Sequence, residues 1–417
     1  MDVKKIIKGM FFLHLVLFGL CIIGLTLATS VGAQKKEILI GSILPMTGGD
    51  PEPGYHVFNA RTLAVEKINA EGGIKSMGGA MIKFINTDHQ GKPEIALAEA
   101  ERLVRQGAKI ITGPFMSGIA LVLGQFCEKN RVLLMLTNAV GYELTQQGFK
   151  YTFRHHFNNK IAVQDLFAYI EGAQKKTGEK IKTIGLLYEN SIWGNTAAKF
   201  SREESKNRGW EIVSDLSYQM GLTDATMLVT KLKAANPDVL VSCAYVADNI
   251  LLMKTMAEKR YYAKGILSPG SGMMSPNFVK QLGKTADYWV GSAPSATNPK
   301  LPGILQVNEA YQKRFGHGMP DLAILGYHGV MCLRVALEMA GSDDPDKLRE
   351  AFLKMNVPPG QKENHNHYPW KFDETGQNPE GHSMVSQIID GKLKTVWPFD
   401  YAERDFIYPI PPWEKRL

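Results

Sequence analysis

Small polar residues follow two apolar runs within residues 110–140, where they could attack a substrate or hold a ligand. The run Ile110–Thr112 ends at Gly113-Pro114, a helix is predicted to open near Ser117, and the run Val132–Leu136 leads into the sequence TNAV. A serine in this place can be a nucleophile, part of a phosphate-binding loop or a donor to a bound carboxylate. It can also be a helix N-cap with no ligand at all, because serine is one of the preferred residues there.

The nucleophile patterns that would make this region catalytic do not occur in the sequence. A nucleophile elbow needs glycine two residues on either side of the serine, and Phe115 and Ile119 occupy those positions around Ser117. Ser271 fails in the same way, because Pro269 precedes it by two residues. Neither serine is therefore expected to attack a substrate.

Phosphate-binding and metal-binding patterns are also missing from the sequence. It contains neither a Walker glycine–lysine loop nor the pattern G-x-G-x-x-G. The densest histidine pairs, at 155–156 and at 365 and 367, lack zincin spacing, so we interpret them as exposed loop histidines. We expect no enzyme activity, no metal and no cofactor.

The order of elements around Ser117 favours ligand binding instead. In open α/β sheets, ligands collect at the carboxyl ends of the strands. A helix N-terminus with small residues holds an anion through backbone N–H groups and a hydroxyl. A second polar strand end follows the helix closely, so we interpret both places as one carboxylate anchor. Its residues are Ser117, Thr137, Asn138, Ala139 and Val140.

Alternating strand-like and helix-like segments supply the strand ends that this anchor needs. Many predicted strands are near-continuous apolar runs, as in parallel strands buried on both faces. The predicted strands are 38–44, 81–86, 110–112, 132–136, 184–188, 211–216, 239–243, 265–267 and 288–291. The other predicted helices are 57–70, 93–106, 195–207, 224–235, 248–259, 303–315 and 322–340. The βα order predicts an α/β fold of doubly wound parallel sheets, and Asp390-Gly391 between two strand-like runs predicts a hairpin.

The ends and the composition predict an exported protein with two domains. A basic start, the apolar stretch 10–27 and small residues at 31–33 are typical of a signal peptide, residues 1–33, cleaved after Ala33. Lys4, Lys5 and Lys8 less Asp2 take +2 from the total of +7, leaving about +5 without a dense basic block, so no nucleic acid partner is expected. No later segment is expected to span a membrane. An odd number of cysteines follows the signal peptide, which implies a free thiol; they are Cys127, Cys243 and Cys332.

Four longer stretches carry a family resemblance. They are ILIGSILPMTGGDPEPGYHVFNARTLAVEKINAEGGI, LAEAERLVRQGAKIITGP, LLMLTNAVGYELTQQGFKYTFR and FDETGQNPEGH. The chain resembles the leucine/isoleucine/valine-type substrate-binding proteins, the type I periplasmic binding proteins of branched-chain amino acid ABC importers. The resemblance implies a Venus flytrap of two α/β lobes with a three-crossing hinge, lobe one at 35–155 and 294–372 and lobe two at 156–293 and 373–417. It also implies a periplasmic monomer that works with ABC permease and ATPase subunits of the inner membrane.

The resemblance assigns roles to single residues. Ser117 matches the hydroxyl that holds a ligand carboxylate, and the TNAV loop matches a segment that grips the ligand by its backbone and a threonine hydroxyl. Val140 stands at that threonine position and lacks the hydroxyl, while Thr137 and Asn138 are nearby. Tyr245 matches an aromatic residue that covers the ligand from the second lobe.

The chain departs from the amino acid binders of this family at one important place. Where they have an acid that pairs with the ligand ammonium group, this chain has Gly270 and Ser271, and Asp248 is a nearby carboxylate that could substitute. A buried ammonium without a partner is costly. The disulfide common near the site is also absent, because Asp88 and Met116 occupy its places.

Aromatic and polar residues near the predicted strand ends complete the candidate site. They are Tyr55, Phe115, Trp193, Tyr245, His156 and Asn158. Together with the missing acid, they predict an importer-type binding protein for an aromatic or aliphatic carboxylate. The alternatives are a branched-chain amino acid, an amide or urea as the ligand, and a ligand-sensing role for a separate membrane receptor.

Overall fold

Two large β-sheets and the helices around them make up the computed structural model of the chain, which describes residues 36–48, 51–270 and 272–416. The predicted signal peptide and the predicted site residue Ser271 lie outside the described residues. From Glu37 to Leu417 the chain forms one compact unit, and the α/β class expected from the sequence is confirmed.

The first sheet is parallel throughout, with the strand order β2-β1-β3-β4-β5. Its strands are β1 (Glu37–Leu44), β2 (Met81–Asp88), β3 (Ile110–Thr112), β4 (Leu133–Leu136) and β5 (Thr152–Arg154). Alternate residues of β4 enter opposite cores, because Leu133 and Met135 pack on one face while Leu134 and Leu136 pack on the other. Burial on both faces explains why these strands read as unbroken apolar runs.

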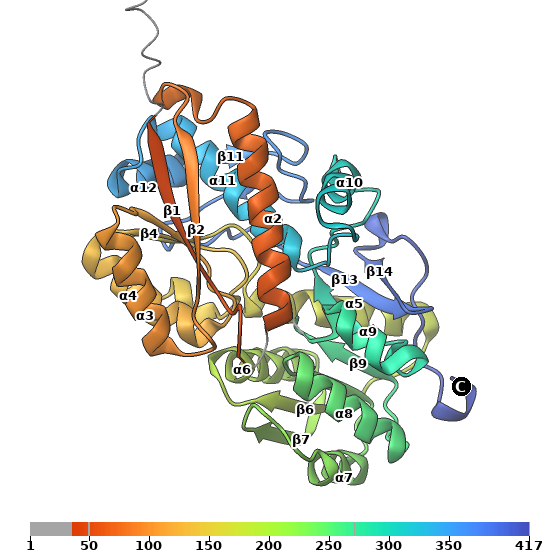
Figure 1. The fold of residues 1–417 in the computed structure, drawn as a ribbon. Coiled ribbons are helices and arrows are strands. Elements are labelled where there is room, and N and C mark those ends of the chain that lie inside the picture. Colours follow the sequence, from red (N-terminus) through yellow and green to blue (C-terminus); the bar gives the residue numbers. More distant parts are fainter. Residues whose placement is uncertain (1–35, 49–50, 271, 417) are drawn as a thin grey trace, which may run out of the picture. The chain divides into compact units, whose positions relative to one another are not determined.

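Helices cover both faces of this first sheet (Figure 1). On one face lie α2 (Pro51–Ala70), α10 (Ile304–Phe315), α11 (Ala323–Ala340) and α12 (Pro345–Lys354). On the other lie α3 (Pro93–Arg105) and α4 (Ser117–Asn130). The pair β11 (Asn356–Val357) and β12 (Trp370–Lys371) follows α12. We call these elements, with the first sheet, lobe one.

Helix α11 is the most apolar element of lobe one. By length and composition it is the one helix among the described residues that could cross a membrane, although the sequence analysis expected no such segment after the signal peptide. Of this stretch, 78% is buried inside the protein, which accounts for its composition. Two glycines let it approach its neighbours closely: a Cβ at Gly326 would meet Val57, and one at Gly329 would meet the Thr137 side chain at 2.4 Å.

The second sheet has the order β14-β13-β10-β9-β8-β6-β7. Its strands are β6 (Thr183–Glu189), β7 (Glu211–Tyr218), β8 (Val239–Cys243), β9 (Gly265–Ser268), β10 (Val290–Ala293), β13 (Met384–Ile389) and β14 (Lys392–Trp397). The predicted hairpin is confirmed, because Ile389 pairs with Lys392 across Asp390-Gly391, whose φ angles of 51° and 67° suit a two-residue turn. The strands from β6 to β10 pair in parallel, as the sequence predicts, and the hairpin of β13 and β14 adds two antiparallel strands, so the sheet is mixed.

Helices also cover both faces of the second sheet. On one face lie α5 (Asn159–Thr177) and α6 (Ile192–Asn207). On the other lie α7 (Thr226–Ala235), α8 (Val246–Glu258) and α9 (Pro276–Leu282). We call these elements, with the second sheet, lobe two. The chain passes between the lobes after β5, after β10 and after β12.

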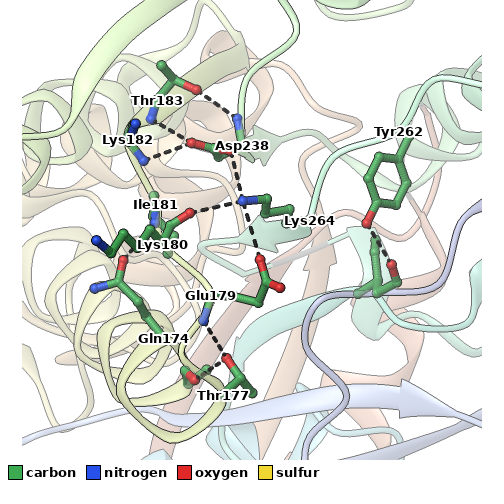
Figure 2. Close-up of polar contacts among 12 residues, drawn as sticks. Gln174, Thr177, Glu179, Lys180, Ile181, Lys182, Thr183, Asp238, Tyr262 and Lys264 are labelled. Carbon is green, nitrogen blue, oxygen red and sulfur yellow. Dashed lines mark hydrogen bonds and ion pairs between the residues drawn. The ribbon is translucent and has the colours of Figure 1, made fainter.

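A paired polar network ties together the amino ends of β6, β8 and β9 (Figure 2). The Asp238 carboxylate accepts hydrogen bonds from the backbone N–H groups of Lys182 (2.8 Å) and Thr183 (3.1 Å). Its other oxygen lies 3.3 Å from the ammonium nitrogen of Lys264, which also lies 3.5 Å from Glu179. This network fixes the strand ends that are opposite to those predicted to bind a ligand.

Candidate functional site

One cavity lies where the carboxyl ends of strands from both sheets meet. Lobe one lines it with Phe115, Ser117, Asn138, Val140, Leu322 and Leu325. Lobe two and the segment that leads into it line it with Phe157, Trp193, Tyr245, Pro269, Gly270 and Met274. Parallel strands of both lobes thus place the loops that follow them around one space, as the ligand-site rule for open sheets predicts.

The cavity is small in this structure. Its volume of about 30 Å³ has room for a few water molecules at most. Two hydrogen bonds join the lobes beside it: Thr196 Oγ1 donates to Glu143 at 2.7 Å, and Ser275 Oγ donates to Glu52 at 2.5 Å. An organic ligand therefore needs the lobes to part before it can enter.

Ser117 lies in the cavity wall, but it does not cap its helix. Helix α4 begins at Ser117 itself and its N-cap residue is Met116, which makes no side-chain capping bond. The Ser117 hydroxyl instead accepts a hydrogen bond from the backbone N–H of Gly141 at 3.1 Å. The helix-cap interpretation is therefore wrong. Because a hydroxyl accepts and donates at the same time, its proton can still serve a ligand.

Two buried arginines hold the segment 137–141, which we call the ligand loop. Arg61 of α2 donates to Thr137 Oγ1, and Arg154 of β5 donates to the carbonyl oxygens of Ala139 (3.3 Å) and Gly141 (2.7 Å). These contacts take the Thr137 hydroxyl and the Ala139 carbonyl away from the cavity, so Asn138 and Val140 are the loop residues that line it.

The sequence analysis missed both arginines, although one signal for Arg61 was present. It falls on the buried face of α2 together with Val57, Ala64 and Ile68. A cation within a helix-spaced apolar stripe is unusual, because such a stripe normally faces the core.

Trp193 and Tyr245 form the lobe-two wall, with ring centroids 4.9 Å apart. Trp193 stands in the first turn of α6, where the N-cap Ser191 accepts its backbone N–H. The buried Glu189 fixes this turn by accepting from Ser191 N (2.7 Å) and Gly194 N (2.9 Å). Burial raises the pKa of this carboxyl, while the hydrogen bonds from Ser191 and Gly194 oppose the rise.

Several predicted site residues lie outside the cavity wall. Tyr55 is 49% exposed on α2. Asp248 is buried, and its carboxylate accepts from the backbone N–H groups of residues 221 and 222 at 3.0 and 2.9 Å, so it is occupied in holding that loop. Asn158 is the N-cap of α5 and accepts from Ile161 N at 3.0 Å. His156 is buried, with Nδ1 2.9 Å from the carbonyl oxygen of the wall residue Phe157.

The interpretation of the histidine pairs as exposed loop residues is wrong. His155 and His156 are fully buried and His365 is 8% exposed. For His155 and His156 the reason is that the chain crosses between the lobes here and a second crossing segment packs on it: Gln377 Nε2 donates to His156 O, and Asn378 Nδ2 donates to His155 O. Burial lowers the pKa of His155 to about 3.

The cavity wall carries neither an acidic nor a basic side chain among the residues that the structure describes. Two buried polar atoms of wall residues also have no partner within the described ranges: Trp193 Nε1, which can only donate, and Asn138 Oδ1, which can only accept. The other end of the Asn138 amide donates to Leu322 O at 3.0 Å. An organic body thus meets apolar walls, two donors at Ser117 and Trp193, and one acceptor at Asn138.

No His, Cys, Asp or Glu side chain lines the cavity among the described residues. Within the described part of the chain, no three His, Cys, Asp or Glu residues are grouped to hold a metal ion. The three cysteines after the predicted signal peptide are all free and buried, which agrees with the free thiol expected from their odd number. Burial raises the pKa of these thiols, Cys127, Cys243 and Cys332.

Known proteins are similar to this chain in sequence and in fold. The periplasmic binding protein family matches residues 37–392. The Leu/Ile/Val-binding protein homolog 7 of Brucella abortus (strain 2308) is 29% identical over 384 residues, which cover 89% of this chain and 94% of that protein.

Two solved structures share the fold with a TM-score of 0.73 at 22% identity. One is the branched-chain amino acid transporter substrate binding protein LivJ from Streptococcus pneumoniae in complex with isoleucine, covering 86% of this chain and 98% of that chain. The other is a solute binding protein of an ABC transporter from Rhodopseudomonas palustris BisB5 in complex with 3,4-dihydroxybenzoic acid, covering 91% and 99%.

The family match extends over the first sheet, over the second sheet up to the start of β14, and over the strand ends that form the cavity wall. The solved structures repeat the same arrangement over nearly their whole length. The chain therefore belongs to the periplasmic binding protein family, as a solute-binding protein of the periplasmic or extracellular space.

Proposed function

We propose that the protein captures an organic carboxylate with an aromatic or aliphatic body and without an α-ammonium group. One observation carries the proposal: no acidic side chain lines the cavity among the described residues, while aromatic rings and hydrogen-bond donors do. Ser117 and Trp193 Nε1 would donate to the carboxylate, and the rings of Phe115, Trp193 and Tyr245 would pack on the body of the ligand.

The balance of desolvation energies favours the simple acid over the amino acid. An ammonium group that leaves water without a carboxylate partner loses several kcal/mol, and Asp248 is occupied elsewhere. A carboxylate instead gains charge-assisted hydrogen bonds, which are stronger than neutral ones. The aromatic acid bound by the Rhodopseudomonas palustris protein shows that this fold can accept such a ligand.

Calorimetry with isovalerate, a benzoate or phenylpropenoate, and leucine under the same conditions tests the proposal. We expect the best acid to bind at least ten-fold more tightly than leucine, a difference of about 1.4 kcal/mol. Leucine binding in the micromolar range together with no heat from the acids would refute it.

A branched-chain amino acid is the second candidate ligand, with amides and urea beside it. It is favoured by the Leu/Ile/Val-binding name of the Brucella abortus relative and by the unpartnered Asn138 Oδ1, which could accept from an N–H group of the ligand. The same calorimetric titrations decide between the acid and the amino acid. Titrations with isovaleramide and urea test the neutral ligands.

We further propose that the protein is a monomer without enzyme activity that delivers its ligand to ABC permease and ATPase subunits. Lobe boundaries at 155/156, 293/294 and 372/373 and cleavage after Ala33 belong to this proposal. Mass spectrometry of the exported protein should find Gln34 at its N-terminus, and retention of Met1 would contradict it. Neighbouring genes for a sensor kinase, rather than for permeases and ATPases, would instead favour the sensing role.

A further inference from the structure

Arg61 and Arg154 are the two fully buried arginines of lobe one, and both contact the ligand loop. Each side chain has 0% exposure. Arg61 reaches the start of the loop at Thr137, and Arg154 reaches its end at Gly141. The loop that lines the cavity is therefore fixed from both ends by positive charge.

The partners of Arg61 are all neutral. One guanidinium nitrogen donates to Ser42 Oγ at 2.7 Å and to Thr112 O at 3.4 Å, and the other donates to Thr137 Oγ1. Its Nε has no partner in the described part of the chain. Burial lowers its pKa to about 9, with no charged neighbour contributing, so it carries a full positive charge at neutral pH.

Arg154 differs from Arg61 in its surroundings. It donates to Gln377 Oε1, Gly141 O and Thr145 Oγ1, which are also neutral. The carboxylates of Glu143 and Asp373, however, act on it through space: burial lowers its pKa to about 9 and these two acids oppose that shift. Arg154 thus has nearby negative charge within the protein, whereas the hydrogen-bond partners of Arg61 are neutral and it forms no ion pair within the described residues.

A buried charge without a counter-charge is costly and is normally compensated. Arg61 bonds Thr137, and the next residue, Asn138, lines the cavity wall. Both residues are buried, and charges interact more strongly across a buried region than across water.

We infer that Arg61 is a specificity-determining residue that makes the cavity select a negatively charged ligand group, while Arg154 only positions the ligand loop. The inference rests on the proposed function and adds to it the residue that sets the charge preference. Arg61 acts on the ligand through the ligand loop and by its field, without touching the ligand itself.

A pair of ligands with the same shape and different charge separates these two roles. We would titrate benzoate and benzamide, or isovalerate and isovaleramide, into the wild-type protein, Arg61→Met, Arg61→Lys and Arg154→Met. Arg61→Met should reduce the acid-to-amide affinity ratio about ten-fold, and Arg61→Lys should restore most of the ratio. Arg154→Met should weaken acid and amide alike and leave the ratio within about two-fold.

An unchanged ratio in Arg61→Met, or an equal fall of the ratio in Arg154→Met, would overturn the inference. If the arginine variants do not fold, two smaller changes carry the test: Thr137→Val removes a contact of Arg61, and Thr145→Val removes a contact of Arg154. The ratio should fall about three-fold in the first variant only. Thr255→Val, a buried threonine of α8, is the control for the substitution itself.

The result that would refute the proposed function differs from the result that would refute this inference. If the wild-type protein prefers leucine to the simple acids, the proposed function is refuted. Leucine and leucinamide then replace the acid and amide pair, since both keep the ammonium group and differ only at the carboxylate. The same ten-fold fall in Arg61→Met would support Arg61 as the selecting residue, and an unchanged ratio would refute it.

Discussion

Two small sets of polar groups at opposite ends of the lobe-two sheet differ in how far their hydrogen bonds are satisfied. At the amino ends, Asp238 and Lys264 pair with each other and with backbone groups from neighbouring segments (Figure 2). Near the carboxyl ends, the cavity-wall residue Trp193 has an Nε1 without a partner among the described residues, and so has Asn138 of lobe one at its Oδ1. The comparison indicates that the groups of the Asp238 network stabilise the fold, while two residues of the cavity wall keep hydrogen-bonding capacity that a ligand can use.

The largest expected effect is a loss of stability when the Asp238 network at the amino ends of the strands is broken. Asp238→Ala removes the acceptor for the N–H groups of Lys182 and Thr183 and the partner of Lys264. Hydrogen bonds to charged groups contribute about 1.5 kcal/mol or more each, so the free energy of unfolding should fall by about 3 kcal/mol. Denaturant titration measures this loss, and calorimetry should show ligand affinity unchanged. A loss of affinity without a loss of stability would reverse the assignment of the two ends.

The pH dependence of the free energy of unfolding should distinguish the region of His155, beside the cavity, from the Asp238 network at the amino ends of the strands. Burial lowers the pKa of His155, next to β5 and the cavity, to about 3. A group with a depressed folded-state pKa binds its proton more readily when unfolded, so its stability contribution is complete above about pH 6.5 and declines as the pH falls towards 3. One proton costs at most about 1.4 kcal/mol per pH unit, so up to about 2.7 kcal/mol should be lost between pH 6.5 and 4.5.

His155→Asn provides the control for this pH dependence, and its unfolding free energy should vary less over the same range. The amino-end network responds at lower pH. Burial alone would raise the pKa of Asp238, but hydrogen bonds from Lys182 and Thr183 and the charge of Lys264 lower it below its ordinary 3.8. Its contribution is therefore present above pH 3.8 and lost below it. Equal slopes in the wild-type and His155→Asn proteins between pH 6.5 and 4.5 would contradict the assignment.

Many of the strands and helices could be predicted from the sequence. The apolar run that ends at Gly113-Pro114 located β3, the run that leads into TNAV located β4, and Asp390-Gly391 located the hairpin. Strand β5 was missed because it has three residues, two of them polar, and α5 was missed because it opens with polar residues. Local patterns fail for short or polar elements whose burial depends on distant segments.

The cavity was less predictable for the same reason. Ser117, Trp193 and Tyr245 follow strand ends, so strand order alone brings them towards one edge of their sheets. Leu322 and Leu325 reach the wall from the start of α11, far along the chain, and no local pattern indicates that approach. The path of the chain between the lobes also decides that His155 is buried, which spacing alone could not show.

The variant Ser117→Ala tests whether the cavity wall donates a hydrogen bond to the ligand. Losing a charge-assisted hydrogen bond should weaken carboxylate binding about ten- to hundred-fold, or about 2 kcal/mol. Stability should also fall, by about 1 kcal/mol, because Gly141 N–H loses its acceptor. Calorimetry and denaturant titration measure the two effects. Ser201→Ala, at a buried serine that bonds within α6, is the control and should leave affinity unchanged. Equal affinity in both variants would limit Ser117 to a structural role.

Trp193→Phe should give the smallest of these effects. It should lower ligand affinity with little loss of stability, whereas Asp238→Ala should lower stability with no loss of affinity. Trp193→Phe removes the Nε1 donor that has no partner among the described residues, while an aromatic ring remains beside Tyr245. Deleting a buried donor without a partner relieves a desolvation cost that partly offsets the lost packing, so the free energy of unfolding should change by less than about 1 kcal/mol. Carboxylate affinity should nevertheless fall about five-fold, or about 1 kcal/mol, if Nε1 donates to the ligand. Trp289→Phe is the matched control, because Trp289 does not line the cavity and its Nε1 already contacts Met253 Sδ. This substitution should lower stability and leave affinity unchanged. An affinity for the acid that survives Trp193→Phe undiminished would show that this donor is not used, and Ser117 would then be the principal side-chain donor for the carboxylate.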